Sequence, residues 1–184
     1  NRYKELQAAE GAARLLPKVQ AAIDKNISGA QNVHGLQEPS FDSGVFTAEL
    51  SGQHTQTIEN EDYSGFLSIP ALDLELPSMA ELNDLHLKQT PCLYTGSYLD
   101  GSAILAGHNY TGHFGRLQYL KFGDCIFFTD MKGVTYDYAV ISLETLKGTD
   151  VEQMEKGDWD LTLFTCTYDG TQRTTVRCRK TNRT

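Results

Sequence analysis

The chain has 184 residues, 40% of them hydrophobic, and a formal net charge of −8. This length is enough for one domain with a sizeable hydrophobic core and some appendages. The acidic balance argues against nucleic acid as a partner, because phosphate binding needs clustered Lys and Arg side chains. The sequence contains no run of about eighteen apolar residues, so none of its segments is predicted to span a membrane.

The first predicted element is a helix over residues 2–25, within an N-terminal helical segment 1–25. Apolar side chains recur there at a spacing close to 3.6 residues, and alanines fill many positions between them. Pro17 interrupts the pattern and should kink the helix or restart it, because proline cannot donate a helical hydrogen bond. We expect a packing or spacer helix with no part in chemistry.

Residues 26–64 form a second segment, which is polar, with scattered Gly, Ser, Gln and Asn and few apolar residues. This composition favours a surface segment that is partly flexible. A short strand is expected within it at residues 45–48.

β-Strand patterns dominate the third segment, residues 65–181. Alternating apolar and polar side chains over residues 134–140 are typical of a strand with one wet face. Short helices are expected at residues 113–120 and 150–156. Strands are expected near residues 65–70, 72–76, 102–107, 124–129, 134–143, 161–166 and 173–179, with at least one more between 82 and 95. Many short strands with little helix predict a mostly β domain whose sheet closes, or nearly closes, into a barrel.

The candidate nucleophile is Cys166, at the end of an apolar, β-branched stretch over residues 161–166. The turn-rich residues 167–172 separate it from a second strand pattern that begins at Arg173. Such a strand–turn–strand unit places the thiol at the edge of one strand and the Arg173 guanidinium nearly opposite it. A nearby cation favours the reactive thiolate. The alternative is a buried structural thiol, the commonest fate of cysteine.

Arg177 is the second candidate for a charge-stabilising role. By the period of two it lies on the same strand face as Arg173, but about 13 Å further along at about 3.3 Å per residue. Arg173 is therefore the better candidate for stabilising an oxyanion or a bound substrate.

His108 is the candidate acid–base residue among five histidines. It follows an apolar strand pattern, and Gly107 lets the backbone turn so that His108 lies at the strand end. His113 is the rival, with an exposed or capping position at the start of a short helix as its other interpretation. Cys, His and Arg at three strand ends predict catalysis by a thiol nucleophile.

The other three histidines have no expected role in the reaction. His86 alternates with leucines and is expected to face solvent from a strand. His34 and His54 lie in the polar segment, outside the predicted barrel.

Residues 162–166, Thr-Leu-Phe-Thr-Cys, resemble the TLxTC signature of sortases, the cysteine transpeptidases of Gram-positive cell surfaces. Residues 106–109, Ala-Gly-His-Asn, are similar to the catalytic-His segment of that family. Further segments in the family's order extend the resemblance from about residue 65 to residue 180: residues 66–70 and 74–77 resemble its first core strands, and residues 114–117 and 121–124 resemble the helix and turn after the His.

The resemblance implies a sortase-type eight-stranded β-barrel with short helices, and it implies roles for particular residues. His108, Cys166 and Arg173 correspond to the catalytic residues of the family. Substrate binding is expected of residues around them, namely Asn109, Thr165, Tyr168 and Arg177. No cofactor and no metal are implied. The acidic residues 148–160 could bind calcium, but without an EF-hand pattern a solvated surface is the favoured interpretation.

The resemblance also implies an activity and partners. Cys166 would cleave an LPxTG-like sorting signal between Thr and Gly through a thioacyl intermediate, and an amine of a peptidoglycan precursor or a pilin would take the acyl group. The enzyme would act at the extracellular face of the cell membrane, anchored by an N-terminal helix that this sequence lacks.

Residues 107–109 and 114–117 are similar to class B sortases, and the surroundings of Cys166 and Cys178 are similar to classes C and D. Without an Asp-Pro-aromatic lid motif, surface-protein anchoring is favoured over pilus polymerisation.

Two rival functions stay open at this point. One is a non-catalytic binding module on the same barrel, because a fold does not fix a function. The other is a cysteine protease that resolves the thioacyl with water. Because Cys166 must stay a free thiol, at most one disulfide can form, and Cys92, Cys125 and Cys178 are expected to be small buried residues.

Overall fold

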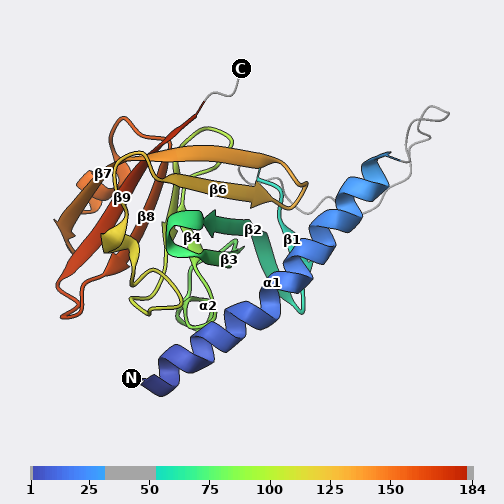
Figure 1. Ribbon diagram of the computed structural model, residues 1–184, viewed down its shortest axis with the longest axis horizontal. Coiled ribbons are helices and arrows are strands. Elements are labelled where there is room, and N and C mark those ends of the chain that lie inside the picture. The colour runs from blue at the N-terminus through green and yellow to red at the C-terminus, as the bar shows by residue number, and fades with distance from the viewer. Residues whose placement is uncertain (1, 32–52, 182–184) are drawn as a thin grey trace.

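A computed structural model describes residues 2–31 and 53–181 as one closed β-barrel with a long N-terminal helix beside it (Figure 1). The helices are α1 (Arg2–Gln31), α2 (Asp84–Leu87) and α3 (Val151–Glu155), with 3-10 turns at Pro70–Leu72 and Leu117–Tyr119. The strands are β1 (Gln56–Ile58), β2 (Glu61–Ile69), β3 (Leu74–Met79), β4 (Cys92–Thr95), β5 (Ala103–Ala106), β6 (Cys125–Asp130), β7 (Thr135–Lys147), β8 (Leu161–Cys166) and β9 (Gln172–Lys180).

Eight of these strands close the barrel in the order β2-β3-β4-β5-β8-β9-β7-β6, and β6 pairs back onto β2. The pairing of Gly65 with Asp130 belongs to this closure. Gly65 is required there because a Cβ atom would lie 2.0 Å from the carbonyl oxygen of Thr129, and because its φ of +145° is unfavourable for other residues. The mostly β, eight-stranded barrel expected from the sequence is confirmed.

The barrel interior is filled by inward-facing apolar side chains from every part of the sheet. Leu67 and Phe128 come from the two strands that close the barrel, and Leu105, Leu163 and Val176 come from the opposite side. All five are at most 2% exposed. Burying this apolar surface is what makes the alternating strand patterns fold into a closed sheet.

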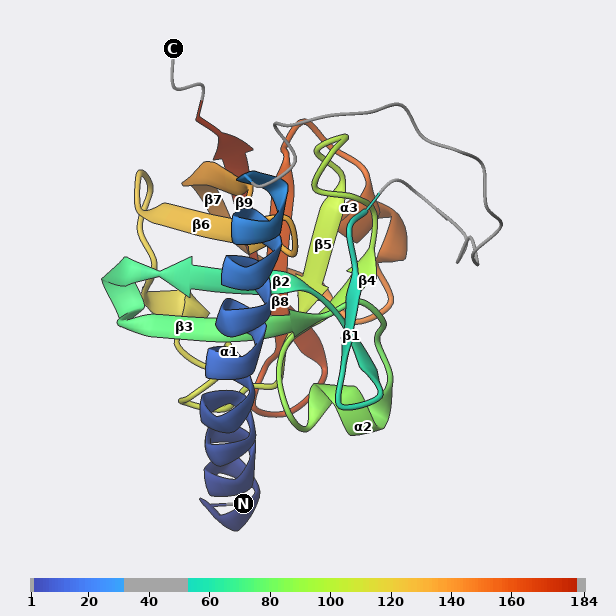
Figure 2. The ribbon, with the colours of Figure 1, turned by 90° about the vertical axis from the view of Figure 1, so that its right-hand side faces the viewer.

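Helix α1 lies across the outside of β2 and β3 (Figure 2). Its Leu15, Val19 and Ile23 pack with Tyr63 of β2 and Met79 of β3, and all five are buried. Pro17 lies on the exposed side of the helix, where water can hydrogen-bond the carbonyl that its ring leaves free. The helix therefore does not restart at Pro17, and it continues to Gln31 instead of ending near residue 25.

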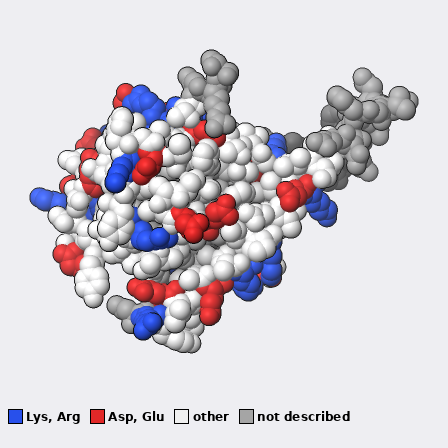
Figure 3. Space-filling view, in the orientation of Figure 1, with Lys and Arg blue, Asp and Glu red and all other residues white. Residues whose placement is uncertain are grey.

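The segment predicted as polar surface, residues 26–64, differs from that expectation where it is described. Residues 56–58 form β1, and β2 begins at Glu61, so strand pairing starts before residue 65. The strand expected at residues 45–48 lies outside the described residues. On the face seen in Figure 3, Lys and Arg alternate with Asp and Glu and do not gather into one basic patch.

Candidate active site

Cys166 is the last residue of β8 and is exposed, although the strand before it is largely buried. It pairs directly with Arg173 of β9, which confirms the register predicted from the hairpin length. The intervening loop is ordered by Asp169, whose carboxylate accepts hydrogen bonds from the backbone N–H of Thr171 at 3.1 Å and from the Thr167 hydroxyl at 2.5 Å. The thiol is therefore held at the edge of the sheet by a structured turn. We call this edge, where β8 ends and β9 begins, the rim.

His108 reaches the same rim from the neighbouring strand β5. β5 runs parallel to β8 with Ala106 opposite Phe164, and the N–H of Gly107 donates to the Phe164 carbonyl oxygen at 3.1 Å. Just beyond these paired residues, His108 and Cys166 line the same pocket. Gly107 is needed at this point because a Cβ there would lie 2.6 Å from the Phe114 ring.

Burial and a neighbouring cation both act on the His108 imidazole. Partial burial lowers the pKa of His108 below 6.5, the positive charge of Lys88 lowers it further, and Asp84 opposes them. The ring centroid lies 4.8 Å from that of Tyr110. A lowered pKa keeps the imidazole neutral at neutral pH, which is the form that can accept a proton.

Two pockets meet at Cys166. The first, of about 710 Å³, is lined by Cys166, His108 and mainly polar residues around them. The second, of about 260 Å³, is lined by Cys166, Arg173 and mostly apolar side chains, including Leu87 and Met154. The thiol therefore has an imidazole and polar space on one side and a guanidinium and apolar space on the other.

Arg173 is held by its own hairpin. Its Nη1 donates to the carbonyl oxygens of Gln172 at 3.1 Å and Gly170 at 3.3 Å. Among the described residues no carboxylate lies within ion-pair distance of it. Its positive charge is therefore available to a ligand beside Cys166.

Arg177 lies away from the rim, in the buried middle of β9, with 1% of its side chain exposed. We call this buried part of the sheet the wall. Its Nε donates to Glu144 at 2.6 Å, and its guanidinium lies 3.8 Å above the Trp159 ring centroid. Three further hydrogen bonds run to the Met154 and Gln153 carbonyls and the Thr162 hydroxyl. Arg177 lines neither of the two pockets at Cys166, so the structure does not bring it together with the other predicted site residues.

Asn109, Thr165 and Tyr168 all line the larger pocket, as expected of residues around the thiol. Tyr168 is 96% exposed, and Thr165 is buried with a hydroxyl that has no hydrogen-bond partner among the described residues. Further residues line this pocket that were not predicted from the sequence, and the N-terminal Glu5 is the most distant of them along the chain. Nothing in the local pattern around Glu5 signals that position.

His113 was expected to be exposed or to cap a helix, and this was wrong. Its side chain is fully buried, and its Nε2 lies 3.3 Å from the carbonyl oxygen of Ala8 in α1. Burial lowers the pKa of His113 to about 4, so the ring is neutral and donates to that carbonyl. His113 thus joins α1 to the barrel.

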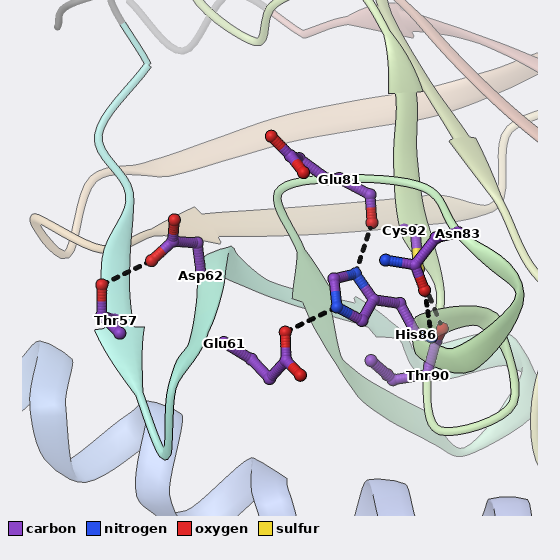
Figure 4. A network of polar contacts seen from close by, with 8 residues as sticks. All are labelled: Thr57, Glu61, Asp62, Glu81, Asn83, His86, Thr90 and Cys92. Atoms are coloured by element: carbon purple, nitrogen blue, oxygen red, sulfur yellow. Dashed lines mark hydrogen bonds and ion pairs between the residues drawn. The ribbon is translucent and has the colours of Figure 1, made fainter.

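His86 was expected to face solvent from a strand, and it lies instead in the single turn of α2 (Figure 4). The N-terminal cap Asn83 accepts from the backbone N–H of His86 at 2.8 Å. The ring contacts the Glu81 carbonyl oxygen through Nδ1 at 2.9 Å and the Glu61 carboxylate through Nε2 at 2.5 Å. Four residues of Leu-His alternation cannot distinguish a strand from one helical turn. His34 lies outside the described residues.

All four cysteines are free thiols. Cys92 and Cys178 are buried as expected, and burial raises the pKa of each to about 12. Cys125 is exposed at the start of β6, so its expected burial was wrong. No three His, Cys, Asp or Glu side chains within residues 2–31 and 53–181 lie close enough together to hold a metal ion.

Comparisons with known proteins identify the class to which this barrel and its Cys–His rim belong. The family described as "Sortase domain" matches residues 67–181, and the chain therefore belongs to the sortase family. A search of curated protein sequences found no match. None of the helices within the described residues is both long and apolar enough to cross a bilayer.

Solved structures of several sortases share the fold. Sortase C of Streptococcus pneumoniae is 19% identical, with a TM-score of 0.66 over 92% of this chain and 97% of that one. Sortase A of Corynebacterium diphtheriae is 18% identical, with a TM-score of 0.62 over 100% and 94% of the two chains. Sortase C1 of Streptococcus agalactiae is 26% identical, with a TM-score of 0.62 over 70% and 72%.

Proposed function

We propose that this protein is a cysteine transpeptidase that cleaves an LPxTG-like sorting signal between Thr and Gly and transfers the acyl group to an amine of the cell wall. The observation that carries the proposal is that Cys166 borders two pockets, one containing His108 and the other Arg173. A thiol nucleophile, an acid–base group and a charge stabiliser then surround one reacting carbonyl.

In the first half of the reaction His108 takes the proton of the Cys166 thiol, and the sulfur attacks the carbonyl carbon of the Thr residue. Arg173 stabilises the negative charge that develops on the carbonyl oxygen. The protonated His108 then gives its proton to the departing Gly amine, and a thioester on Cys166 remains. The lowered pKa of His108 suits this cycle, because the neutral ring accepts a proton and the protonated ring releases it readily.

The apolar pocket beside Arg173 supports a substrate with an apolar side chain on the N-terminal side of the scissile bond, such as the Leu of an LPxTG-like signal. Leu82, Leu87 and Phe164 line it together with residues of α3. Burying a leucine-sized side chain there contributes about 1.5–3 kcal/mol of binding free energy. Asn109, Thr165 and Tyr168 would contact the polar part of the sorting signal from the other pocket.

Transfer to a cell-wall amine is favoured over polymerisation of pilins by the sequence before residue 65, which contains no Asp-Pro-aromatic motif. Pilin polymerisation is the second candidate, because the fold is shared with a sortase C from Streptococcus pneumoniae whose description refers to pilin substrate specificity. The proposed place of action is the outer face of the membrane, with the barrel as catalytic domain and α1 as its covering helix.

Incubation of the protein with a sorting-peptide library, with and without an added amine, tests the proposal. Mass spectrometry should find cleavage after Thr, a free acid when no amine is present, and an amide when amine is added. Products that remain the free acid at every amine concentration would make the protein a protease. A library without any cleaved member would favour a non-catalytic binding module.

A further inference from the structure

The first two turns of α1 border the pockets on both sides of His108. Glu5 lines the pocket of about 710 Å³ that contains Cys166. Lys4 and Gln7 line a different pocket of about 440 Å³, together with Lys88 and His108. The N-terminal turns of the helix extend past β2 and β3 (Figure 2). A helix that the sequence predicts only as a spacer therefore contributes side chains next to the proposed reaction centre.

The position of Glu5 is fixed by how α1 docks on the barrel. Ala8 is fully buried, and its carbonyl oxygen accepts the hydrogen bond from His113. Ala12, one turn further, packs within the barrel core cluster. Gly112 leaves room for the helix, since a Cβ there would lie 3.2 Å from the Ala9 Cβ. Residues 5, 8 and 12 share one helix face, so Glu5 is held towards the pocket by this docking.

Glu5 gives the pocket its charge. Among the described residues no other Asp, Glu, Lys or Arg side chain lines it, and burial lowers the pKa of His108, which keeps that ring neutral at neutral pH. Within the described part of the chain no hydrogen bond or ion pair occupies the Glu5 carboxylate. A carboxylate without a partner in a concave site concentrates cations there.

We propose that Glu5 binds the ammonium group of the acceptor and thereby directs the second substrate to the thioester. The inference rests on the proposed transfer reaction and adds to it a residue that positions the acceptor, a primary amine that is cationic at neutral pH. Lys4 and Lys88 repel such a group from the pocket on the other side of His108, so the acceptor enters on the Glu5 side.

The transfer step balances with the groups present. The acceptor ammonium loses one proton to His108, and its nitrogen attacks the thioester carbonyl carbon. An amide C–N bond forms, the C–S bond breaks, and the second proton of the nitrogen goes to the Cys166 sulfur. The products are the amide, the free thiol and a protonated His108, which releases its proton to solvent.

The test compares two nucleophiles in Glu5→Gln, which removes the charge at nearly constant shape. Transfer to a primary amine such as glycinamide, which is partly cationic near neutral pH, is measured against hydrolysis of the same thioester, as a ratio of products over a range of amine concentrations. The same ratio is measured with hydroxylamine, which is uncharged at neutral pH. Thioester formation is common to all products and cancels from each ratio.

Glu5→Gln should lower the slope of transfer against amine concentration about 3- to 10-fold for the cationic amine and leave the hydroxylamine slope within about twofold. Glu10→Gln is the matched control, because Glu10 is an exposed carboxylate of the same helix that lines no pocket at Cys166, and both slopes should be unchanged.

An unchanged slope for the cationic amine in Glu5→Gln overturns the inference while leaving the proposed function intact. Equal losses for both nucleophiles overturn it as well, because they would show a general disturbance of the pocket. If the unmodified protein forms no thioester with any sorting peptide, the proposed function fails and the inference falls with it.

Discussion

Arg173 and Arg177 lie four residues apart on β9, in two regions of the barrel with opposite character. Arg177 lies in the barrel wall, where Glu144 neutralises it and the Trp159 ring covers it. Arg173 lies at the rim, where it bonds to two backbone carbonyls of its own loop and faces a pocket. The same side-chain type is thus a structural element in one region and an available charge in the other.

The cysteines repeat this contrast between wall and rim. Cys178 lies in the wall one residue after Arg177 and is fully buried, whereas Cys166 lies at the rim opposite Arg173 and is exposed. The rim is open to substrate, and no carboxylate of the described residues pairs with Arg173 there. The wall is closed to substrate, and Glu144 pairs with Arg177. Both properties depend on the position of each residue along its strand, and neither depends on residue type.

Replacing the rim arginine should have the largest effect. Arg173→Lys keeps the charge but loses the planar fork of donors, so kcat/KM for a sorting peptide should fall about 10²- to 10³-fold. The melting temperature should change by less than about 2 °C, because the residue is only partly buried. If the Arg173→Lys enzyme retains more than about half of its activity, Arg173 takes no part in the reaction.

Replacing Arg177, the arginine of the wall, should lower the stability of the folded protein. Arg177→Lys cannot reproduce the hydrogen bonds to Glu144, Met154 and Gln153, so the free energy of unfolding should fall by about 3 kcal/mol, or about 6–12 °C in melting temperature. Arg179→Lys is the control on the same strand, since its ion pair with Asp158 is exposed and should contribute less than about 1 kcal/mol. Thermal melts of both variants provide the measurement, and equal shifts would contradict the buried network.

The contrast between wall and rim also predicts which cysteines react. Iodoacetamide should modify Cys166 first and Cys125 next, because both are exposed and only Cys166 lies opposite an arginine. Cys92 and Cys178 should react at least about 100-fold more slowly in the folded protein, since burial raises the pKa of each to about 12. Peptide mapping after limited alkylation tests this order. Early modification of Cys178 would contradict the burial of that thiol in the folded protein.

The smallest expected effect concerns pH. The neutral form of His108 is required to activate the thiol, so kcat/KM should fall as pH drops through its pKa, with a midpoint below pH 6.5. Lys88→Gln removes a cause of the lowered pKa and should move that midpoint upward by a few tenths of a pH unit. Asp84→Asn should move it downward. Shifts in the same direction for both variants would exclude this electrostatic account.

The sequence predicts the parts of the site that depend on local pattern. The length of the turn after Cys166 is enough to pair it with Arg173, and the strand that ends at Gly107 is enough to bring His108 to a strand end. Family resemblance adds the closure of eight strands into a barrel. Neither the local pattern nor the family resemblance predicts that Arg177 is buried, because its partners Glu144 and Trp159 are far away along the chain.

Contacts between distant segments account for what the sequence does not predict. Glu5 enters the site because α1 docks through Ala8 and His113, a contact across 105 residues that no local pattern reveals. His86 was misassigned because a one-turn helix carries no distinctive periodicity. Cys125 was misassigned because it is the first residue of β6, where burial has not yet begun.

Trapping the thioester tests the central claim most directly. The protein is mixed with a sorting peptide, quenched in acid within the first turnovers and analysed by intact-mass and peptide mass spectrometry. We expect an adduct with the mass of the acyl portion up to Thr, located on Cys166, and no such adduct in Cys166→Ala, which should melt like the unmodified protein. An adduct on another residue, or cleavage of the peptide by Cys166→Ala, would contradict the account.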